Sequence, residues 1–304
     1  MKRISEKIVF FGSGPVAAKS LNLLIQNFEI EAVITKPAKT RKNDPVPVID
    51  LCNKLKIKTF LPANKLELDD FLQRNIIKSK LAILIDYGII VSQNSIDYFQ
   101  LGIVNSHFSL LPKLRGADPI TFSILSGEKE TGVSLMMLTS GMDEGPLLTQ
   151  KSISLSEFTT TSQLTNDLVI LSNELLIKFI PRYLLKEITP HNQSSDIETT
   201  YSRKLTKQDG LIDWTKSSIH IEREIRAFNE WPKSYMNIKD KLIIIIEAVS
   251  INESGKPGSS LVRDGQLIYY CGKGAINIKK IKPSGKNEMD IKAFLAGYRY
   301  LFIN

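Results

Sequence analysis

Through the first half of the chain, short apolar runs alternate with segments whose hydrophobic residues have helical spacing. Residues 7–12 form an apolar run that ends in the turn Gly12–Pro15, residues 16–27 are helically spaced, and 31–35 form a second run. A strand, a glycine turn, a helix and a second strand form a βαβ unit, which implies parallel strands. Further strands are predicted at 81–85, 103–105 and 133–137, and helices at 49–55 and 159–185. This pattern predicts an α/β fold with a mostly parallel sheet.

The pattern changes after residue 190. Residues 191–200 are polar and rich in serine, which is typical of a linker. Beyond them, strand-like runs at 242–246, 267–270 and 276–278 alternate with turns of Gly, Ser and Asn. We therefore expect a second, small β-rich domain of the barrel type, and a chain of 304 residues suits two domains. The expected division is a catalytic domain at 1–189, a linker at 190–204 and a C-terminal domain at 205–304.

The formal net charge is +8, and it is concentrated near the C-terminus. Residues 232–304 hold 12 lysines and arginines against 6 aspartates and glutamates. A basic surface raises the local concentration of anions and suits a polyanionic partner such as a nucleic acid. The alternative is a lysine-rich surface that only keeps the protein soluble. Charge alone does not decide between the two.

The cysteines and the N-terminus indicate the compartment. Cys52 and Cys271 are far apart in the sequence, and neither a disulfide framework nor metal-ligand spacing is implied. The N-terminus lacks the apolar core and cleavage site of a signal peptide, and no apolar stretch approaches the 18 or so residues of a membrane span. We expect a cytoplasmic protein that does not enter a membrane.

The densest group of polar residues follows the strand predicted at 103–105. Asn105 and His107 are two residues apart, so their side chains are expected on one face at the carboxyl edge of the sheet, where α/β proteins bind ligands. Asp143 lies between Gly141 and Gly145, which allow its loop to turn towards the same edge. An amide N–H can stabilise a developing oxyanion, a histidine can move a proton, and a carboxylate can orient the imidazole. Together these residues suit acylation of an amine.

Each of these residues also has a simpler interpretation. A histidine near a strand end is more often structural or merely exposed than catalytic, and Asp143 could cap a turn. The turn Gly12–Pro15 lacks the third glycine and the acidic residue of a dinucleotide site, and a P-loop and metal-ligand clusters are absent from the sequence. No metal is therefore expected.

Longer motifs make the sequence recognisable. The segment Asn-Ser-His-Phe-Ser-Leu-Leu-Pro at 105–112, followed by Arg115-Gly116, resembles the signature of folate-dependent formyltransferases. The segments at 10–13, 130–134 and 143–145 resemble the same superfamily. Further segments at 203–206, 212–214, 225–232 and 285–289 are similar to the methionyl-tRNA formyltransferase family. The resemblance covers nearly the whole chain in the right order.

The resemblance implies a Rossmann-like catalytic domain, a linker and a C-terminal barrel similar to an OB fold. It implies 10-formyltetrahydrofolate as formyl donor and initiator methionyl-tRNA as acceptor. No obligate protein partner is evident from the sequence. The catalytic residues would be Asn105, His107 and Asp143. The folate segment would be Ser109, Leu110, Leu111 and Pro112.

The resemblance also assigns tRNA contact to the basic loop at 36–47. Its basic residues are Lys36, Lys39, Arg41 and Lys42, with Arg41 as the expected principal contact in the acceptor stem. This loop departs from the family pattern, because in the family it is usually longer and contains glycines. Here no glycine occurs between Gly14 and Gly88.

Three alternatives remain open. Formyltransferases that act on nucleotide-linked amino sugars share the catalytic signature but do not need a basic loop or a basic C-terminal domain. A non-enzymatic RNA-binding protein on the same fold would not need the three catalytic residue types. A hydrolase that releases formate from the same donor would not need the C-terminal domain.

Overall fold

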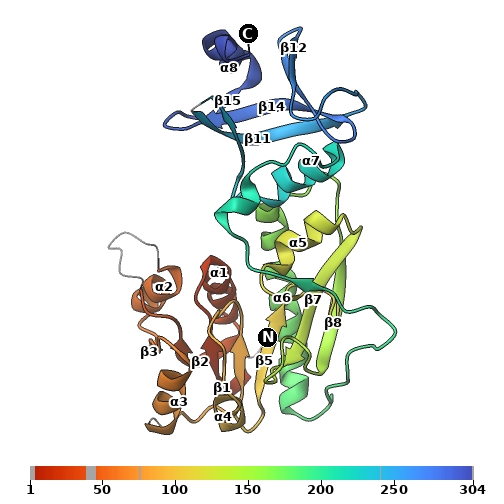
Figure 1. Ribbon diagram of the computed structural model, residues 1–304. Coiled ribbons are helices and arrows are strands. Elements are labelled where there is room, and N and C mark those ends of the chain that lie inside the picture. Colours follow the sequence, from red (N-terminus) through yellow and green to blue (C-terminus); the bar gives the residue numbers. More distant parts are fainter. Residues whose placement is uncertain (1–3, 39–45, 75–76, 240, 303–304) are drawn as a thin grey trace. The chain divides into compact units, whose positions relative to one another are not determined.

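The computed structural model describes residues 4–38, 46–74, 77–239 and 241–302, and they form two compact units (Figure 1). Unit 1 comprises residues 1–116, 130–154 and 165–202, and unit 2 comprises 117–129, 155–164 and 203–304. The segments 117–129 and 155–164 thus pack with the C-terminal part of the chain. The sequence-based division at 189 and 205 remains a prediction.

Unit 1 is built on a seven-stranded sheet in the order β3-β2-β1-β4-β5-β7-β8. Its strands are β1 (Ile4–Phe11), β2 (Phe28–Ile34), β3 (Thr59–Phe60), β4 (Ala82–Leu84), β5 (Ile103–His107), β7 (Glu130–Met137) and β8 (Leu147–Ser154). The strands from β3 to β5 are parallel, whereas β7 is antiparallel to β5 and β8 to β7. The predicted mostly parallel α/β sheet is confirmed, with an antiparallel pair at one edge.

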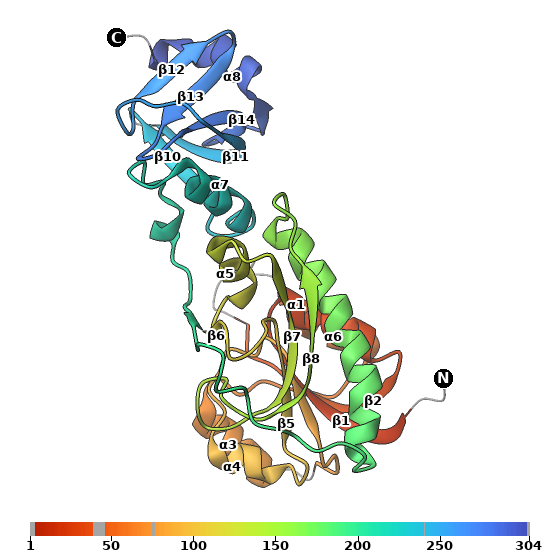
Figure 2. The ribbon, with the colours of Figure 1, turned by 90° about the vertical axis from the view of Figure 1, so that its right-hand side faces the viewer.

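Helices cover both faces of this sheet. They are α1 (Pro15–Leu24), α2 (Pro47–Leu55), α3 (Lys65–Arg74), α4 (Gln93–Tyr98) and α6 (Thr161–Leu184). α1 and α2 each begin with a proline at the first turn, where its missing N–H costs no hydrogen bond. Figure 2 shows α6 running beside β7 and β8, and Lys151 of β8 pairs with Glu174 of α6 at 3.3 Å.

Alternation along β5 decides which side chains face which helices. The Ser106 hydroxyl contacts the Ser172 hydroxyl of α6 at 2.7 Å, so Ser106 faces α6. Ile103 packs on the opposite face, in a buried cluster with residues of α3 and α4. Because side chains alternate along a strand, Asn105 and His107 lie on the face of Ile103. The even spacing that the sequence showed therefore places both polar residues on one face.

A short two-stranded sheet in unit 1 joins β6 (Arg115–Gly116) to β9 (Tyr201–Ser202) in parallel. The polar segment 191–202 is thus hydrogen-bonded to the sheet-bearing unit at several points. His191 pairs with Leu147 through both backbone groups, and Thr200 accepts from the backbone N–H of Arg115 at 2.9 Å. These hydrogen bonds hold in place a segment whose composition is typical of a flexible linker.

Unit 2 contains an antiparallel sheet of six strands, as expected for the second half of the chain. Its core path is β10-β11-β14-β13-β12, and β15 pairs with β14. The elements are α5 (Pro119–Ser126), α7 (Ser218–Ala227), β10 (Ser234–Ile238), β11 (Lys241–Ile251), β12 (Ser260–Arg263), β13 (Gln266–Tyr270), β14 (Ala275–Pro283), β15 (Met289–Asp290), α8 (Ile291–Tyr298) and single turns at Lys207–Gly210 and Arg299–Leu301. The predicted strands at 242–246, 267–270 and 276–278 lie within β11, β13 and β14. In the part of unit 2 that is described, β10 and β12 are the two ends of the path.

Unit 2 has its own hydrophobic core. It is formed by side chains of β11, β13 and β14 together with Ile221 and Ile225 of α7 and Phe294 of α8. Phe294 is fully buried and stacks on Tyr298 with ring centroids 4.9 Å apart. No helix within the described ranges is both long and apolar enough to cross a membrane.

Two buried ionisable groups make the stability of unit 2 sensitive to alkaline pH. Burial raises the pKa of Tyr269 to about 12 and that of Cys271 to about 11. In the unfolded chain these groups have ordinary pKa values, near 8.5 for Cys and 10 for Tyr. Because these values are lower than those in the folded protein, the unfolded chain loses its protons first, from about pH 9 upward. The stability that these two groups contribute is therefore fully present below about pH 8 and is lost between about pH 9 and pH 12. We expect the urea midpoint of unit 2 to fall over this interval.

The thiol contribution to this fall can be separated from that of the phenol. Cys271→Ala removes the thiol titration and should leave only the part of the fall that begins near pH 10. Equilibrium unfolding in urea from pH 8 to pH 11, followed by the fluorescence of Trp214, which stacks on Tyr269 at 4.5 Å, measures both. A midpoint that stays constant over this range would contradict the assignment.

Candidate active site

Asn105, His107 and Asp143 converge in unit 1. Asn105 Nδ2 donates a hydrogen bond to Asp143 Oδ1 at 3.3 Å, and His107 Nδ1 lies 3.7 Å from Asp143 Oδ2. Asn105 and His107 are 7% and 6% exposed, while the Asp143 side chain is 16% exposed. The carboxylate is therefore the centre of the group and its most accessible member. The structure brings together the three residues that the sequence singled out.

The second ring nitrogen of His107 is held inside the protein. Nε2 lies 2.9 Å from the carbonyl oxygen of Leu114, and a carbonyl can only accept, so Nε2 carries a proton and donates it. The other nitrogen, Nδ1, is left to face Asp143. It is thus the ring position at which His107 can gain or lose a proton.

Asp143 reaches this position by an indirect route. Because β7 is antiparallel to β5, its last residue, Met137, pairs with Val104, and the following loop starts beside the amino end of β5. The loop must then run back along the face of the sheet to bring Asp143 to His107. Asp143 has a φ of 48°, and its Oδ2 accepts from the backbone N–H of Gly116 at 2.7 Å. The carboxylate is thus held by three groups from β5 and β6.

The segment Ser109–Pro112 is a rigid support beside the site. Ser109, Leu111 and Pro112 are buried, whereas Leu110 is partly exposed. Ser134 of β7 donates to the Ser109 carbonyl at 2.6 Å and accepts from the Leu111 N–H at 3.1 Å. Since these polar groups are already paired inside the protein, the segment holds the backbone after His107 in place and offers its surface at Leu110.

Known proteins resemble this chain over almost its whole length. The family model "Formyl transferase" matches residues 6–180, and "Formyl transferase, C-terminal domain" matches 204–299. A methionyl-tRNA formyltransferase of Rickettsia massiliae is 33% identical over 97% of this chain and 98% of its own length. A protein of the same name from Thermodesulfovibrio yellowstonii is 34% identical over 97% of this chain and 96% of its own. The chain belongs to the formyl transferase family.

The fold of this formyl transferase is also seen in solved structures. An N-formyltransferase from Helicobacter canadensis, crystallised with folinic acid and dTDP-3-aminofucose, has a TM-score of 0.68 and 20% identity. The match covers 90% of this chain and 98% of that one. At this identity the likeness shows the fold alone, and it agrees with the seven-stranded sheet of unit 1 followed by a separate antiparallel sheet.

The basic residues predicted to contact tRNA are described only in part. Lys36 follows β2, and its backbone N–H donates to the Ser13 hydroxyl at 3.2 Å, which ties it to the turn after β1. Its ammonium lies against Gly88, in the segment that follows β4. Lys39, Arg41 and Lys42 lie outside the described residues. Within the described ranges, no three His, Cys, Asp or Glu side chains are grouped so that they could hold a metal ion.

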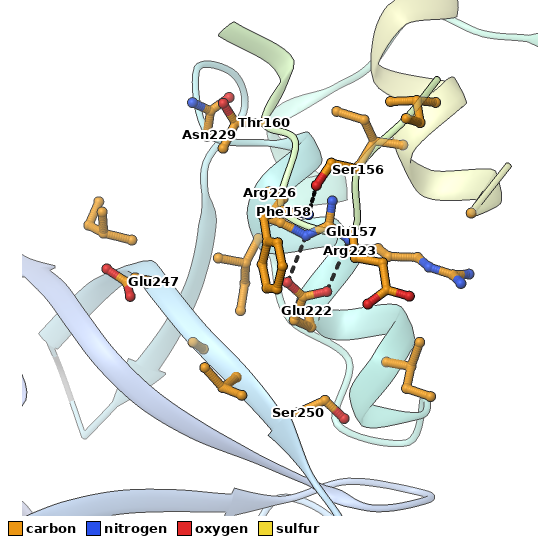
Figure 3. A pocket seen from close by; sticks show the side chains of 18 of the residues that line it. Ser156, Glu157, Phe158, Thr160, Glu222, Arg223, Arg226, Asn229, Glu247 and Ser250 are labelled. Carbon is orange, nitrogen blue, oxygen red and sulfur yellow. Dashed lines mark hydrogen bonds and ion pairs between the residues drawn. The ribbon is translucent and has the colours of Figure 1, made fainter. Parts of the chain in front are cut away.

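A cavity of about 850 Å³ is lined entirely by residues of unit 2 (Figure 3). It is bounded by α5, α7, β11 and the loop that carries Phe158, whose side chain is 81% exposed. Arg226 makes a two-point contact with Glu222 at 2.7 and 3.0 Å on its wall. None of Asn105, His107 or Asp143 lines it, so the candidate active site does not depend on it.

Several residues that build the site carried no usable sequence signal. The backbone groups of Leu114 and Gly116 hold His107 and Asp143, and their role depends on how loops meet in space. Gly116 has a φ of 101°, and a Cβ there would lie 2.5 Å from the Ser202 carbonyl oxygen, which explains why glycine is required. Gln193 lies in a segment that the sequence indicated only as a linker.

Proposed function

We propose that this formyl transferase moves the formyl group of 10-formyltetrahydrofolate to the free amine of initiator methionyl-tRNA. The convergence of Asn105, His107 and Asp143 supports the chemistry, because these groups match the needs of amine acylation. Full-length relatives at 33% and 34% identity are named methionyl-tRNA formyltransferase, which supports the acceptor. The structural neighbour crystallised with folinic acid supports a folate donor.

Transfer is direct in this mechanism. The amine nitrogen forms a bond to the formyl carbon, the bond from that carbon to N10 of the folate breaks, the amine loses one proton and N10 gains one. Asn105 Nδ2 has two protons, and Asp143 accepts one of them. The second can donate to the formyl oxygen as negative charge develops on it.

His107 and Asp143 handle the charge and the proton. With Nε2 committed to Leu114, a protonated Nδ1 adds positive charge next to Asn105 and stabilises the same oxyanion. Asp143 is the most exposed of the three and is therefore placed to accept the proton that the attacking amine loses. Its contact with Gly116 keeps one oxygen aimed at His107 while this happens.

In this mechanism the segment Ser109–Pro112 forms one side of the folate-binding site. Ser109 donates its hydroxyl to the Lys113 carbonyl at 2.6 Å, so it has no hydroxyl proton to offer a folate. Leu110 has exposed apolar surface, which suits contact with a pterin ring. Leu110 contacts the folate donor in this proposal. The positions of Leu110 and His107 are fixed by the buried residues Ser109, Leu111 and Pro112.

A direct assay tests the function. Purified protein is incubated with 10-formyltetrahydrofolate and either charged initiator tRNA, charged elongator tRNA or a nucleotide-linked amino sugar. We expect formyl-methionyl-tRNA to form with charged initiator tRNA. Formylation of the amino sugar alone would favour the alternative acceptor. Release of tetrahydrofolate without any acceptor would indicate a hydrolase.

The basic loop gives a second prediction on the acceptor. Changing Lys39, Arg41 and Lys42 together to glutamine should raise KM for tRNA and leave kcat much less affected, since phosphate contacts supply binding. Each lost phosphate contact should also reduce the slope of log KM against log salt by about 0.7–0.9. Steady-state kinetics at several salt concentrations measure both effects.

A matched variant controls for net charge. Lys54, Lys56 and Lys65 are exposed and lie on or beside α2 and α3. Changing these three to glutamine removes the same charge from another part of unit 1 and should leave KM and its salt slope nearly unchanged. Equal effects of the two triple variants would show that only overall charge matters.

A further inference from the structure

Gln193 uses both ends of its side-chain amide within the candidate active site. Its Nε2 donates to the carbonyl oxygens of Asp143 at 2.7 Å and Gly145 at 2.9 Å. Its Oε1 accepts from Arg115, at 3.3 Å from Nε and 2.7 Å from Nη2. A glutamine amide can donate twice and accept twice, so all of its capacity is used here. The neighbouring residues of the segment 191–198 are exposed, whereas Gln193 is partly buried.

These bonds close a ring around the carboxylate of Asp143. The carboxylate accepts from the N–H of Gly116, Gly116 follows Arg115 in the chain, and Gln193 joins the Arg115 guanidinium to the backbone of Asp143. The ring therefore fixes both the backbone and the side chain of one residue. Asp143 needs this support because residues 138–146 form neither helix nor strand and its own φ is 48°.

The same segment also holds the partner of His107. Thr200 Oγ1 accepts from the Leu114 N–H at 2.9 Å, and the Leu114 carbonyl accepts from His107 Nε2. Both loops that contact the imidazole and the carboxylate are thus attached to residues 193–202. Gln193 is the residue of this segment that bonds directly to the Asp143 loop with its side chain.

We propose that Gln193 is a positioning residue for formyl transfer, which acts by holding Asp143 against His107 and Asn105. This rests on the proposed function of the site. Gln193 does not contact the reacting groups, so its effect is on geometry, and misplacing a catalytic group by about 1 Å can cost about 100-fold in rate. Loss of a comparable supporting partner in metal sites costs about 10–100-fold.

Gln193→Ala should lower kcat by about 10–100-fold with KM for both substrates changed less than about threefold. Asn192→Ala is the matched control, because it truncates an adjacent amide that is exposed and for which the described structure shows no side-chain hydrogen bond. It should behave like the wild type. Equal losses of kcat in the two variants, or a rise in KM with kcat unchanged, would overturn the proposal.

Gln193→Glu separates the two carbonyl contacts from the contact with Arg115. It keeps the acceptor for Arg115 but, when ionised, has no proton to donate to the carbonyls of Asp143 and Gly145. Because the Arg115 guanidinium favours the ionised carboxylate, kcat should stay low across neutral pH, as in Gln193→Ala. Wild-type kcat in Gln193→Glu would count against the role of the two carbonyl contacts.

A spectroscopic measurement separates this inference from the proposed function. The ¹⁵N shifts of the His107 ring report its tautomer and its contact with Asp143, whichever substrate the enzyme uses. Gln193→Ala should change the Nδ1 signal of His107, and Asn192→Ala should not. Unchanged His107 signals would refute the positioning role, while changed signals in a protein that does not formylate methionyl-tRNA would refute only the assigned acceptor.

Discussion

Replacing Asp143 with asparagine is expected to lower the rate of formyl transfer by about 10²–10³-fold, or roughly 3–4 kcal/mol. The substitution keeps the size of the side chain, so the loop and the bond from Gly116 can persist. It removes the charge beside His107 Nδ1 and the acceptor for the amine proton. Single-turnover kinetics with saturating donor and methionyl-tRNA measure the chemical step directly, and the tRNA affinity should stay within about twofold.

Asp167→Asn is the matched control for this result. Asp167 is exposed, lies on α6 in unit 1 and undergoes the same chemical change, and it is remote in sequence from both Asp143 and Gln193. It should turn over at the wild-type rate. If Asp143→Asn did so too, the proposed proton path would be wrong.

A double substitution tests whether His107 and Asp143 act as one unit. If they do, His107→Ala combined with Asp143→Asn should cost little more than the more damaging single change, since groups that share one step are strongly non-additive. Additive losses would indicate that the two residues act in separate steps.

Local sequence patterns predicted the parts of this site that depend on a single strand. Asn105 and His107 lie on one face of β5 because strands alternate, and the apolar residues before them identified the strand. The fold class followed in the same way, from the βαβ opening and the later change to short strands. In each case the information lies within about ten residues of the feature that it predicts.

The remaining parts of the site depend on contacts between distant segments. The sequence could place Asp143 near a glycine-flanked turn, but not the antiparallel β7 from which its loop runs back over β5. It could not indicate Gln193, which lies 50 residues from Asp143 and was hidden in a polar segment. Hydrogen bonds between loops depend on the register of strands and on backbone direction, and neither leaves a periodic pattern.

Phe11→Ala is expected to lower the free energy of unfolding of unit 1 by about 3–5 kcal/mol. Phe11 is fully buried at the end of β1, with ring centroids 5.3 Å from Tyr87 and 5.9 Å from Phe99, both edge-on. It pairs with Ile34 of β2 and with Leu84 of β4, so the lost ring belongs to an interior strand of the sheet. A loss of this size is a large part of the 5–15 kcal/mol that typically stabilises a domain.

Phe158→Ala is the control, because it removes the same ring from a position that is 81% exposed, and it should change stability by less than about 0.5 kcal/mol. Urea unfolding followed by hydrogen exchange of peptides from each unit distinguishes the two units. Phe11→Ala should shift the transition of peptides from β1, β4 and β5 and leave those from β11 and β14 at their wild-type midpoint. A shift of less than 1 kcal/mol in the first set would mean that the cluster of Phe11, Tyr87 and Phe99 does not support the sheet that carries Asn105 and His107.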